Sequence, residues 1–117
     1  MAELTVYEKP TCTTCRKLAA LLEQRGIAFE RVDYHADPLS EDELRELVRK
    51  AGVPARELFR RKEPLYRQLG LRDREVGDDE AVALMARHPA LLERPVVVRG
   101  ERAVLARPVE RVEELLG

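Results

Sequence analysis

The sequence predicts an α/β fold with a four-stranded mixed sheet, and three features of the chain indicate it. Residues 4–34 follow the order strand, helix, strand, which is typical of a βαβ unit with two parallel, neighbouring strands. Two β-rich runs later in the chain meet at Gly100-Glu101, as in a hairpin. The pattern between these parts is helical over about residues 38–90. We therefore expect a single domain, residues 1–117, with a helical insertion between strands 2 and 3.

The N-terminal strand, helix and strand have recognisable limits. Residues 4–7 alternate apolar and polar side chains, as a half-buried strand does. The helix that follows is expected to run to about Arg25, with Gly26 as its stop, because glycine readily adopts the conformation that ends helices. Residues 27–34 alternate well enough to form the second strand.

The insertion begins with the clearest helix signal in the chain. Ser40 and Glu43, three residues later, form a capping box, and Gly52 ends the helix that they open. Shorter helical segments follow up to the third strand. After the hairpin, Pro108 is expected to open a last helix, at a position where proline is tolerated.

The composition indicates a globular protein. Hydrophobic residues make up 44% of the chain and charged residues 37%, with a net charge of −1. Because charges of both signs are interspersed, no overall field favours nucleic acid or a membrane. The sequence shows no signal peptide and no apolar run of membrane length, and two closely spaced cysteines suit a reducing compartment. We expect a cytoplasmic monomer without direct contact with nucleic acid or membrane.

The only two cysteines, Cys12 and Cys15, form a CxxC motif between the first strand and the first helix. A CxxC that opens a helix after a strand indicates a thioredoxin-like fold with a redox motif. A helix start carries partial positive charge and free N–H groups, so a thiol there ionises more easily, and the thiolate is the attacking form. Side chains at i and i+3 lie about 5–6 Å apart at Cβ, close enough for a disulfide after a small adjustment. Cys12 is thus the expected attacker, and Cys15 the cysteine that could resolve a mixed disulfide.

Two other interpretations of the cysteine pair stay open. The cysteines could be ordinary small core residues, or they could be half of a zinc site. Zinc needs four ligands, yet the chain has no second CxxC, and its two histidines, His35 and His88, are far apart in sequence. We expect no bound metal and no bound cofactor.

Three arginines stand at positions where a buried or half-buried positive charge could bind an oxyanion near the cysteines. Arg94 precedes Pro95 and the third strand, Arg107 precedes the last helix, and Arg60 lies in the insertion. Arginine presents a fixed fork of donors that suits oxyanions, although any one arginine could equally be a solvated surface charge. In a thioredoxin-like fold the residue before the third strand lies beside the start of the CxxC helix, which favours Arg94.

Four stretches of the sequence carry a resemblance to a known family. They are Tyr7–Lys17 (YEKPTCTTCRK), Leu58–Leu71 (LFRRKEPLYRQLGL), His88–Val98 (HPALLERPVVV) and Ala106–Pro108 (ARP). In this order and spacing the chain resembles the arsenate reductase family of the glutaredoxin-coupled, thioredoxin-fold type, together with the related Spx-type regulators. The resemblance implies a catalytic pair, a substrate-binding set and supporting residues, which are Cys12 with Cys15, then Arg60, Arg94 and Arg107, then Thr13, Thr14 and Pro95.

The reaction that the resemblance implies begins with attack of the Cys12 thiolate on arsenate. The resulting adduct is reduced to arsenite by an external thiol, which could be glutathione, glutaredoxin or thioredoxin. The expected partners are therefore a small oxyanion and a thiol reductant.

Two other functions stay open. Glu8-Lys9 stands where the reductases carry His-Asn, and Cys15 stands where they usually lack a cysteine. The chain could be a general dithiol reductase with another substrate, or an Spx-like regulator that contacts RNA polymerase and senses redox state through the cysteine pair. The three arginines favour the enzyme, because a sensor has less need of an oxyanion site.

Overall fold

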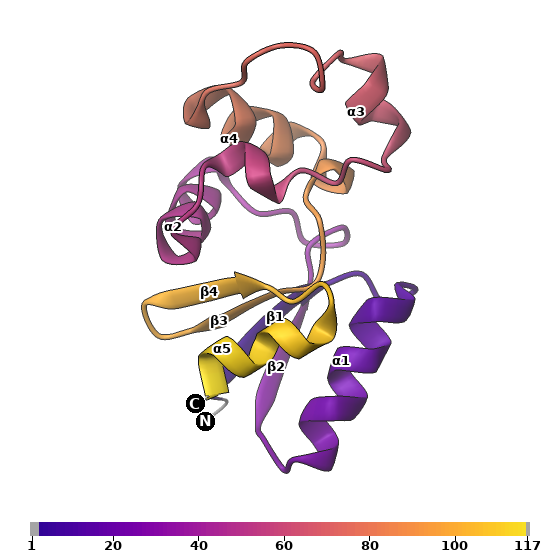
Figure 1. Ribbon diagram of the computed structural model, residues 1–117, viewed down its shortest axis with the longest axis vertical. Helices are drawn as coiled ribbons and strands as arrows, with labels where there is room; N and C mark the ends of the chain where they lie inside the picture. Colours follow the sequence, from indigo (N-terminus) through magenta and orange to yellow (C-terminus); the bar gives the residue numbers. More distant parts are fainter. Residues whose placement is uncertain (1–2, 117) are drawn as a thin grey trace.

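A computed structural model describes residues 3–116 of the chain (Figure 1). The strands are β1 (Leu4–Glu8), β2 (Phe29–Asp33), β3 (Val96–Arg99) and β4 (Arg102–Leu105). The α-helices are α1 (Thr13–Gln24), α2 (Glu41–Ala51), α3 (Pro64–Gln68), α4 (Asp78–Arg87) and α5 (Glu113–Leu116), and the 3₁₀ helices are η1 (Ala55–Leu58), η2 (Pro89–Leu91) and η3 (Val109–Val112). None of the helices in this described part is long and apolar enough to cross a lipid bilayer.

The strands form one mixed sheet in the order β2-β1-β3-β4. β1 and β2 are parallel, with Val6 opposite Arg31, whereas β3 runs antiparallel to both β1 and β4. Val97 at the centre of β3 lies opposite Val6 on one side and Val104 on the other. This arrangement confirms the predicted thioredoxin-like α/β fold, with its mixed sheet and a helical insertion between strands 2 and 3.

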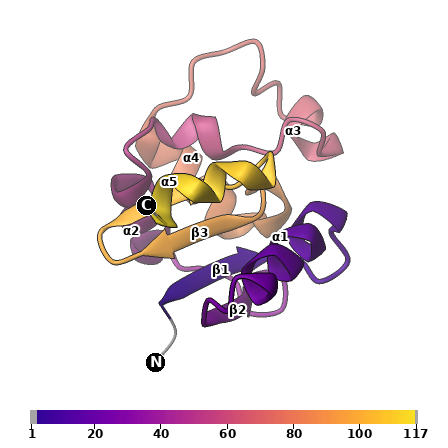
Figure 2. The ribbon, with the colours of Figure 1, turned by 60° about the horizontal axis from the view of Figure 1, so that its bottom comes forward.

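Helices cover both faces of the sheet. Figure 1 shows α2 and α4 of the insertion on one side and α1 and α5 on the other, and α5 contacts β4; Figure 2 shows the same arrangement from a second direction. Side chains of β1 alternate between the two faces, because successive residues of a strand point in opposite directions. Leu4 and Val6 lie in the buried cluster on the α1 side, while Tyr7 packs against the cluster of the insertion. The strand therefore presents its even-numbered side chains to the CxxC helix.

The predicted capping box at the start of α2 is present. The Ser40 Oγ accepts a hydrogen bond from the Glu43 N–H at 3.1 Å, and the Glu43 carboxylate accepts one from the Ser40 N–H at 3.0 Å. Gly52 ends the helix with a left-handed φ of 68°. These local signals fix the first helix of the insertion at the predicted position.

Two elements differ from the prediction. β2 begins at Phe29, not at residue 27, because the N–H of Ile27 bonds the Leu22 carbonyl at 3.0 Å and so belongs to the end of α1. The last helix does not open as an α-helix at Pro108. The Arg111 N–H donates to the Pro108 carbonyl three residues back, at 3.1 Å, and this bond winds the first turn, η3, as a 3₁₀ helix.

Candidate active site

Cys12 lies at the N-terminal cap of α1, where the first turn of the helix begins. Its backbone is extended, with φ −79° and ψ 123°, and its Sγ accepts a hydrogen bond from the backbone N–H of Cys15 at 3.3 Å. The sulfur thus occupies the position that a serine or aspartate oxygen often takes at a helix start. Because free N–H groups and partial positive charge gather there, a thiolate at this position is stabilised.

The two thiols of the motif differ in acidity. Both cysteines are free, Cys12 half-buried and Cys15 only 1% exposed. Burial alone would raise the pKa of the Cys12 thiol, but hydrogen bonding from Cys15 and the influence of the Arg107 and Arg94 guanidinium groups outweigh it, so this pKa lies below its usual value. Burial, followed by the hydrogen bond to Cys12, raises the pKa of Cys15 to about 12. At neutral pH Cys12 therefore carries the larger thiolate fraction of the two cysteines.

Arg94 places a guanidinium group inside the protein near the cysteines. The residue is only 7% exposed, and its Nε and Nη1 atoms are buried without a hydrogen-bond partner among residues 3–116. A buried guanidinium with free donors is costly unless something pairs with it. The free donors favour an anionic ligand at this point, since the guanidinium fork matches the oxygens of an oxyanion.

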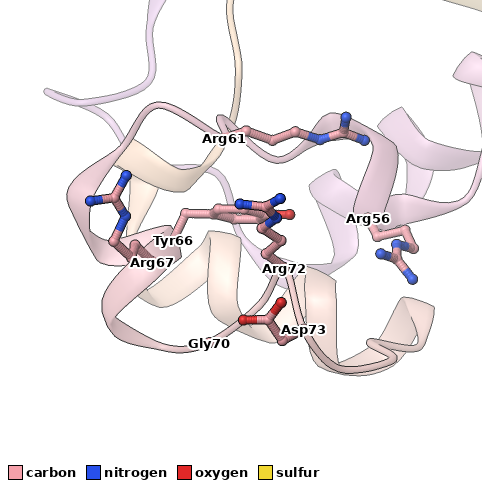
Figure 3. A pocket seen from close by; sticks show the side chains of 7 residues that line it. All are labelled: Arg56, Arg61, Tyr66, Arg67, Gly70, Arg72 and Asp73. Carbon is pink, nitrogen blue, oxygen red and sulfur yellow. The ribbon is translucent and has the colours of Figure 1, made fainter.

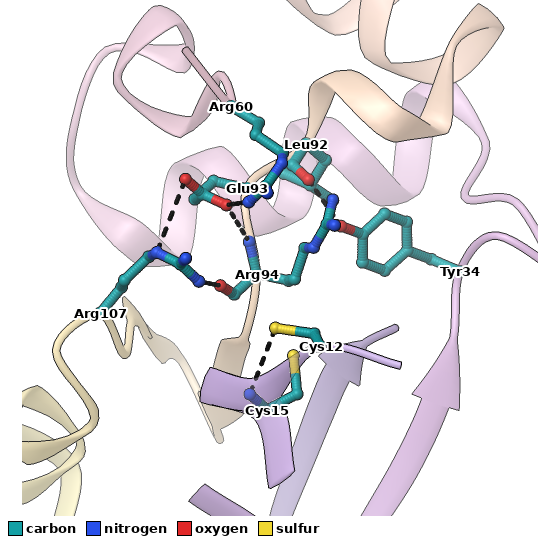
Figure 4. A network of polar contacts seen from close by, with 8 residues as sticks. All are labelled: Cys12, Cys15, Tyr34, Arg60, Leu92, Glu93, Arg94 and Arg107. Carbon is teal, nitrogen blue, oxygen red and sulfur yellow. Dashed lines mark hydrogen bonds and ion pairs between the residues drawn. The ribbon is translucent and has the colours of Figure 1, made fainter. Parts of the chain in front are cut away.

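The β3–β4 hairpin brings Arg107 next to Arg94 (Figure 4). Arg94 stands just before β3 and Arg107 just after β4, and the Ala106 N–H bonds the Pro95 carbonyl at 2.9 Å where the two strands meet. The Arg107 Nη1 then donates to the Arg94 carbonyl at 3.0 Å. Both arginines precede a proline, and both of these peptide bonds are cis.

Arg60 reaches the same network through Glu93. The Arg60 Nη1 lies 2.7 Å from the Glu93 carboxylate, and the Arg107 Nε lies 3.8 Å from the other oxygen of that carboxylate. Figure 4 shows Glu93 between the two guanidinium groups, on the side of Arg94 away from α1. Sequence reasoning missed Glu93, although its place directly before Arg94 was a signal.

Tyr34 is a second residue that the sequence did not single out. It follows β2, is 1% exposed, and donates its hydroxyl hydrogen to the Leu92 carbonyl at 2.5 Å. Burial raises its pKa, with the charge of Arg94 acting in the opposite direction. The hydroxyl therefore stays neutral and anchors the segment that leads to Arg94.

The predicted supporting residues lie around Cys12 and Arg94. Thr13 and Thr14 occupy the first turn of α1, the former exposed and the latter half-buried. Pro95 is buried directly after Arg94. The structure thus gathers the whole predicted set at one end of the sheet, with Arg60 joined to it through Glu93. The roles of these residues in binding and catalysis stay predictions.

Glu8, which stands where the reductases carry histidine, points into the protein. Its side chain is 3% exposed, lies 2.8 Å from the Arg31 Nε, and leaves its second oxygen without a hydrogen-bond partner among the described residues. Its negative charge helps to raise the pKa of Cys15, although burial contributes most to that shift. The Glu8 carboxylate thus disfavours the thiolate form of Cys15.

Neither cysteine lines either of two hollows among the described residues. A hollow of about 520 Å³ lies in the insertion, lined by Arg56, Arg61, Tyr66, Arg67, Gly70, Arg72 and Asp73 (Figure 3). A smaller one of about 290 Å³ borders the network described above and is lined in part by Glu93 and Arg107. The smaller hollow therefore meets the network at Glu93 and Arg107, whereas neither Cys12 nor Arg94 is among the residues that line it. Within residues 3–116, no three His, Cys, Asp or Glu side chains are grouped as a metal site would require.

Comparisons with known proteins agree with this arrangement. The family model of the ArsC family matches residues 7–115. An arsenate reductase of Neisseria meningitidis is 39% identical over 117 residues, which span 99% of this chain and 100% of that protein. The uncharacterized protein YfgD of Escherichia coli is 36% identical, over 98% of both chains.

Solved structures give the same result. The arsenate reductase from Vibrio cholerae superposes with a TM-score of 0.89 at 40% identity, covering 97% of this chain and 98% of its own. The match thus extends over the sheet, the insertion and the cysteine-bearing helix. The chain belongs to the ArsC family.

Proposed function

We propose that this protein is a thiol-dependent arsenate reductase in which the Cys12 thiolate attacks the oxyanion. One observation carries the proposal: a thiol of lowered pKa lies at a helix start beside the Arg94 guanidinium, whose buried donors are free. The relatives described as arsenate reductases in Neisseria meningitidis and Vibrio cholerae support arsenate as the substrate.

The arginines answer an electrostatic difficulty of this reaction. A thiolate and an arsenate dianion repel one another, so the site must supply positive charge before the sulfur can approach arsenic. Arg94 and Arg107 lie where they already stabilise the thiolate, and Arg60 adds a third cation through the Glu93 network. In the proposal these three groups bind and orient the oxyanion, while Thr13 and Thr14 line its approach to the sulfur.

The reaction balances with two thiols for each arsenate. The Cys12 sulfur forms a bond to arsenic, and one arsenate oxygen leaves as water after taking up protons. A second thiolate attacks the Cys12 sulfur, the sulfur–arsenic bond breaks with its electron pair staying on arsenic, and the products are arsenite and a mixed disulfide of Cys12. A further external thiol then reduces this mixed disulfide and frees Cys12. Because the pKa of Cys15 is about 12, this thiol is a weak nucleophile at neutral pH. The second thiol is therefore external in the proposal, supplied by glutathione with glutaredoxin or by thioredoxin, and the protein itself binds no cofactor.

The test is arsenate-dependent consumption of reducing equivalents, with glutaredoxin or thioredoxin supplied in turn. Wild-type protein should turn over with at least one of them, and Cys12→Ser should be inactive with both. Cys15→Ser should keep part of the activity, because the external thiol can resolve the adduct. Failure of the wild-type protein to consume reductant with either partner would exclude arsenate reduction by this chain. We propose that the protein acts as a cytoplasmic monomer.

A second candidate function rests on the cysteine pair itself. Cys12 and Cys15 stand three residues apart at the first turn of α1, and side chains at this spacing lie close enough for a disulfide after a small adjustment. A general dithiol reductase, or an Spx-like regulator that contacts RNA polymerase, would use the pair in this way. Reversible Cys12–Cys15 oxidation in a protein that neither binds nor reduces arsenate would favour this second candidate.

A further inference from the structure

The backbone holds Glu93 and Arg60 side by side. Phe59 and Leu92 form an antiparallel bridge between the insertion and the segment that leads into β3. On either side of the bridge, the Glu93 N–H bonds the Leu58 carbonyl at 2.8 Å and the Arg60 N–H bonds the Leu91 carbonyl at 2.7 Å. The two charged side chains therefore start from fixed neighbouring positions.

The Glu93 carboxylate is enclosed by donors that the proposed reaction needs. It accepts from the Arg60 Nη1 at 2.7 Å and from the Arg94 backbone N–H at 3.2 Å, and its second oxygen lies 3.8 Å from the Arg107 Nε. Its side chain is only 13% exposed, and those of Arg60 and Arg107 are 19% and 31% exposed. Little water separates these charges, so their interactions are stronger than those of a surface ion pair.

A carboxylate and an oxyanion use the same donors in the same geometry. Both accept two parallel hydrogen bonds from a guanidinium fork, and both carry the negative charge that the fork neutralises. Three guanidinium groups face two negative charges in the empty reduced site, those of Glu93 and the Cys12 thiolate. An entering dianion must therefore compete with a negative charge that already occupies two of the three arginines.

We propose that Glu93 is an internal competitor for the oxyanion and so sets which anions the site accepts. The proposal rests on the function assigned above. In the empty site Glu93 holds Arg60 and Arg107 in place and balances their charge. When an oxyanion binds, the carboxylate releases at least Arg107, to which its contact is longest. Monovalent or weakly charged anions are excluded because their interaction with Arg107 is too weak to offset the loss of the Glu93–Arg107 ion pair.

The test is the affinity of reduced wild-type protein and Glu93→Gln for inorganic phosphate and sulfate, measured by calorimetry. Glutamine keeps an oxygen that can accept from Arg60 and from the Arg94 N–H, but it removes the competing charge. We expect the affinity of Glu93→Gln for these anions to be about tenfold higher than that of wild-type protein, which corresponds to the free energy of about one charge-assisted hydrogen bond. Glu57→Gln is the matched control, because Glu57 lines the same hollow and pairs with the exposed Arg61 instead. The affinity of Glu57→Gln for phosphate and sulfate should equal that of wild-type protein.

Binding by Glu93→Gln but not by wild-type protein would also support the proposal. Equal affinities in the two proteins, or no binding by either, would overturn it.

A crystal structure of wild-type protein with sulfate gives a measurement that needs no variant. There the Glu93 carboxylate should be displaced from Arg107 by the anion, and an anion bound while that contact persists would contradict the proposal. Reductant consumption with arsenate reports separately on the assigned function, so the two can fail independently.

Discussion

The Arg107 guanidinium donates a hydrogen bond to the backbone carbonyl of Arg94 at 3.0 Å, across the end of the β3–β4 hairpin. Two arginines from separate segments are thereby held as one unit beside the Cys12 sulfur. The hydrogen bond satisfies a carbonyl at the edge of the site, and it limits the rotation of the Arg107 side chain. The backbone therefore fixes the position of the Arg107 guanidinium relative to Arg94, which in the proposed function would orient both arginines toward an oxyanion.

Replacing Arg94 with alanine should weaken oxyanion binding about ten- to hundredfold. The free donors of its guanidinium are lost, and hydrogen bonds to charged groups contribute about 1.5–3 kcal/mol each. Calorimetry with sulfate or phosphate on reduced protein measures the effect, with the exposed Arg102→Ala as control. The Cys12–Cys15 disulfide should still form. Unchanged anion affinity in Arg94→Ala would show that this arginine is structural.

Cys12 should react with iodoacetamide much faster than Cys15 at neutral pH. The pKa of Cys12 is lowered and that of Cys15 is raised to about 12, so Cys12 has the larger thiolate fraction. Brief alkylation followed by peptide mass spectrometry distinguishes the two sites. Preferential labelling of Cys15 would reverse the assigned roles.

Arg107→Ala should shift the alkylation of Cys12 to higher pH. The guanidinium of Arg107 stabilises the thiolate, so its removal raises the thiol pKa and moves the midpoint of the rate profile upward. Arg111→Ala removes a nearby surface charge that pairs with Glu114 and should leave the midpoint in place. A profile unaffected by Arg107→Ala would mean that the contacts with Cys15 and Arg94 lower the pKa of Cys12 without a contribution from Arg107.

Tyr34→Phe should destabilise the fold by about 1–3 kcal/mol, because the buried Leu92 carbonyl loses its hydroxyl donor. Unfolding in urea measures the change. Tyr7→Phe is a suitable comparison, since the hydroxyl of this half-buried tyrosine has no hydrogen bond among the described residues, and its effect should be small. An equal loss in both variants would assign the effect of Tyr34→Phe to something other than this bond.

Local signals predicted much of the fold. The capping box at Ser40, the stops at Gly26 and Gly52 and the CxxC at a helix start depend on residues near one another in sequence, and the structure places each element accordingly. Boundaries were less predictable where a hydrogen bond decides them, as with Ile27, whose N–H completes the end of α1.

The candidate site was predictable in part, for a related reason. Arg94 was expected beside the cysteines because the topology of the fold fixes the start of the third strand. Glu93 was not, because its role depends on a partner, Arg60, that lies 33 residues away and is brought near by a single bridge. The inward direction of Glu8 follows from the alternation of β1, but the strand was predicted to end one residue too early to include it.

The unequal acidity of the two cysteines has a consequence for the reduction potential of the pair. Groups that stabilise the Cys12 thiolate stabilise the reduced protein and leave the Cys12–Cys15 disulfide without that benefit. A dithiol whose reduced form is favoured in this way makes its disulfide a stronger oxidant. Any Cys12–Cys15 disulfide formed during turnover should therefore be reduced readily by an external thiol, which is itself oxidised and returns the protein to its dithiol form.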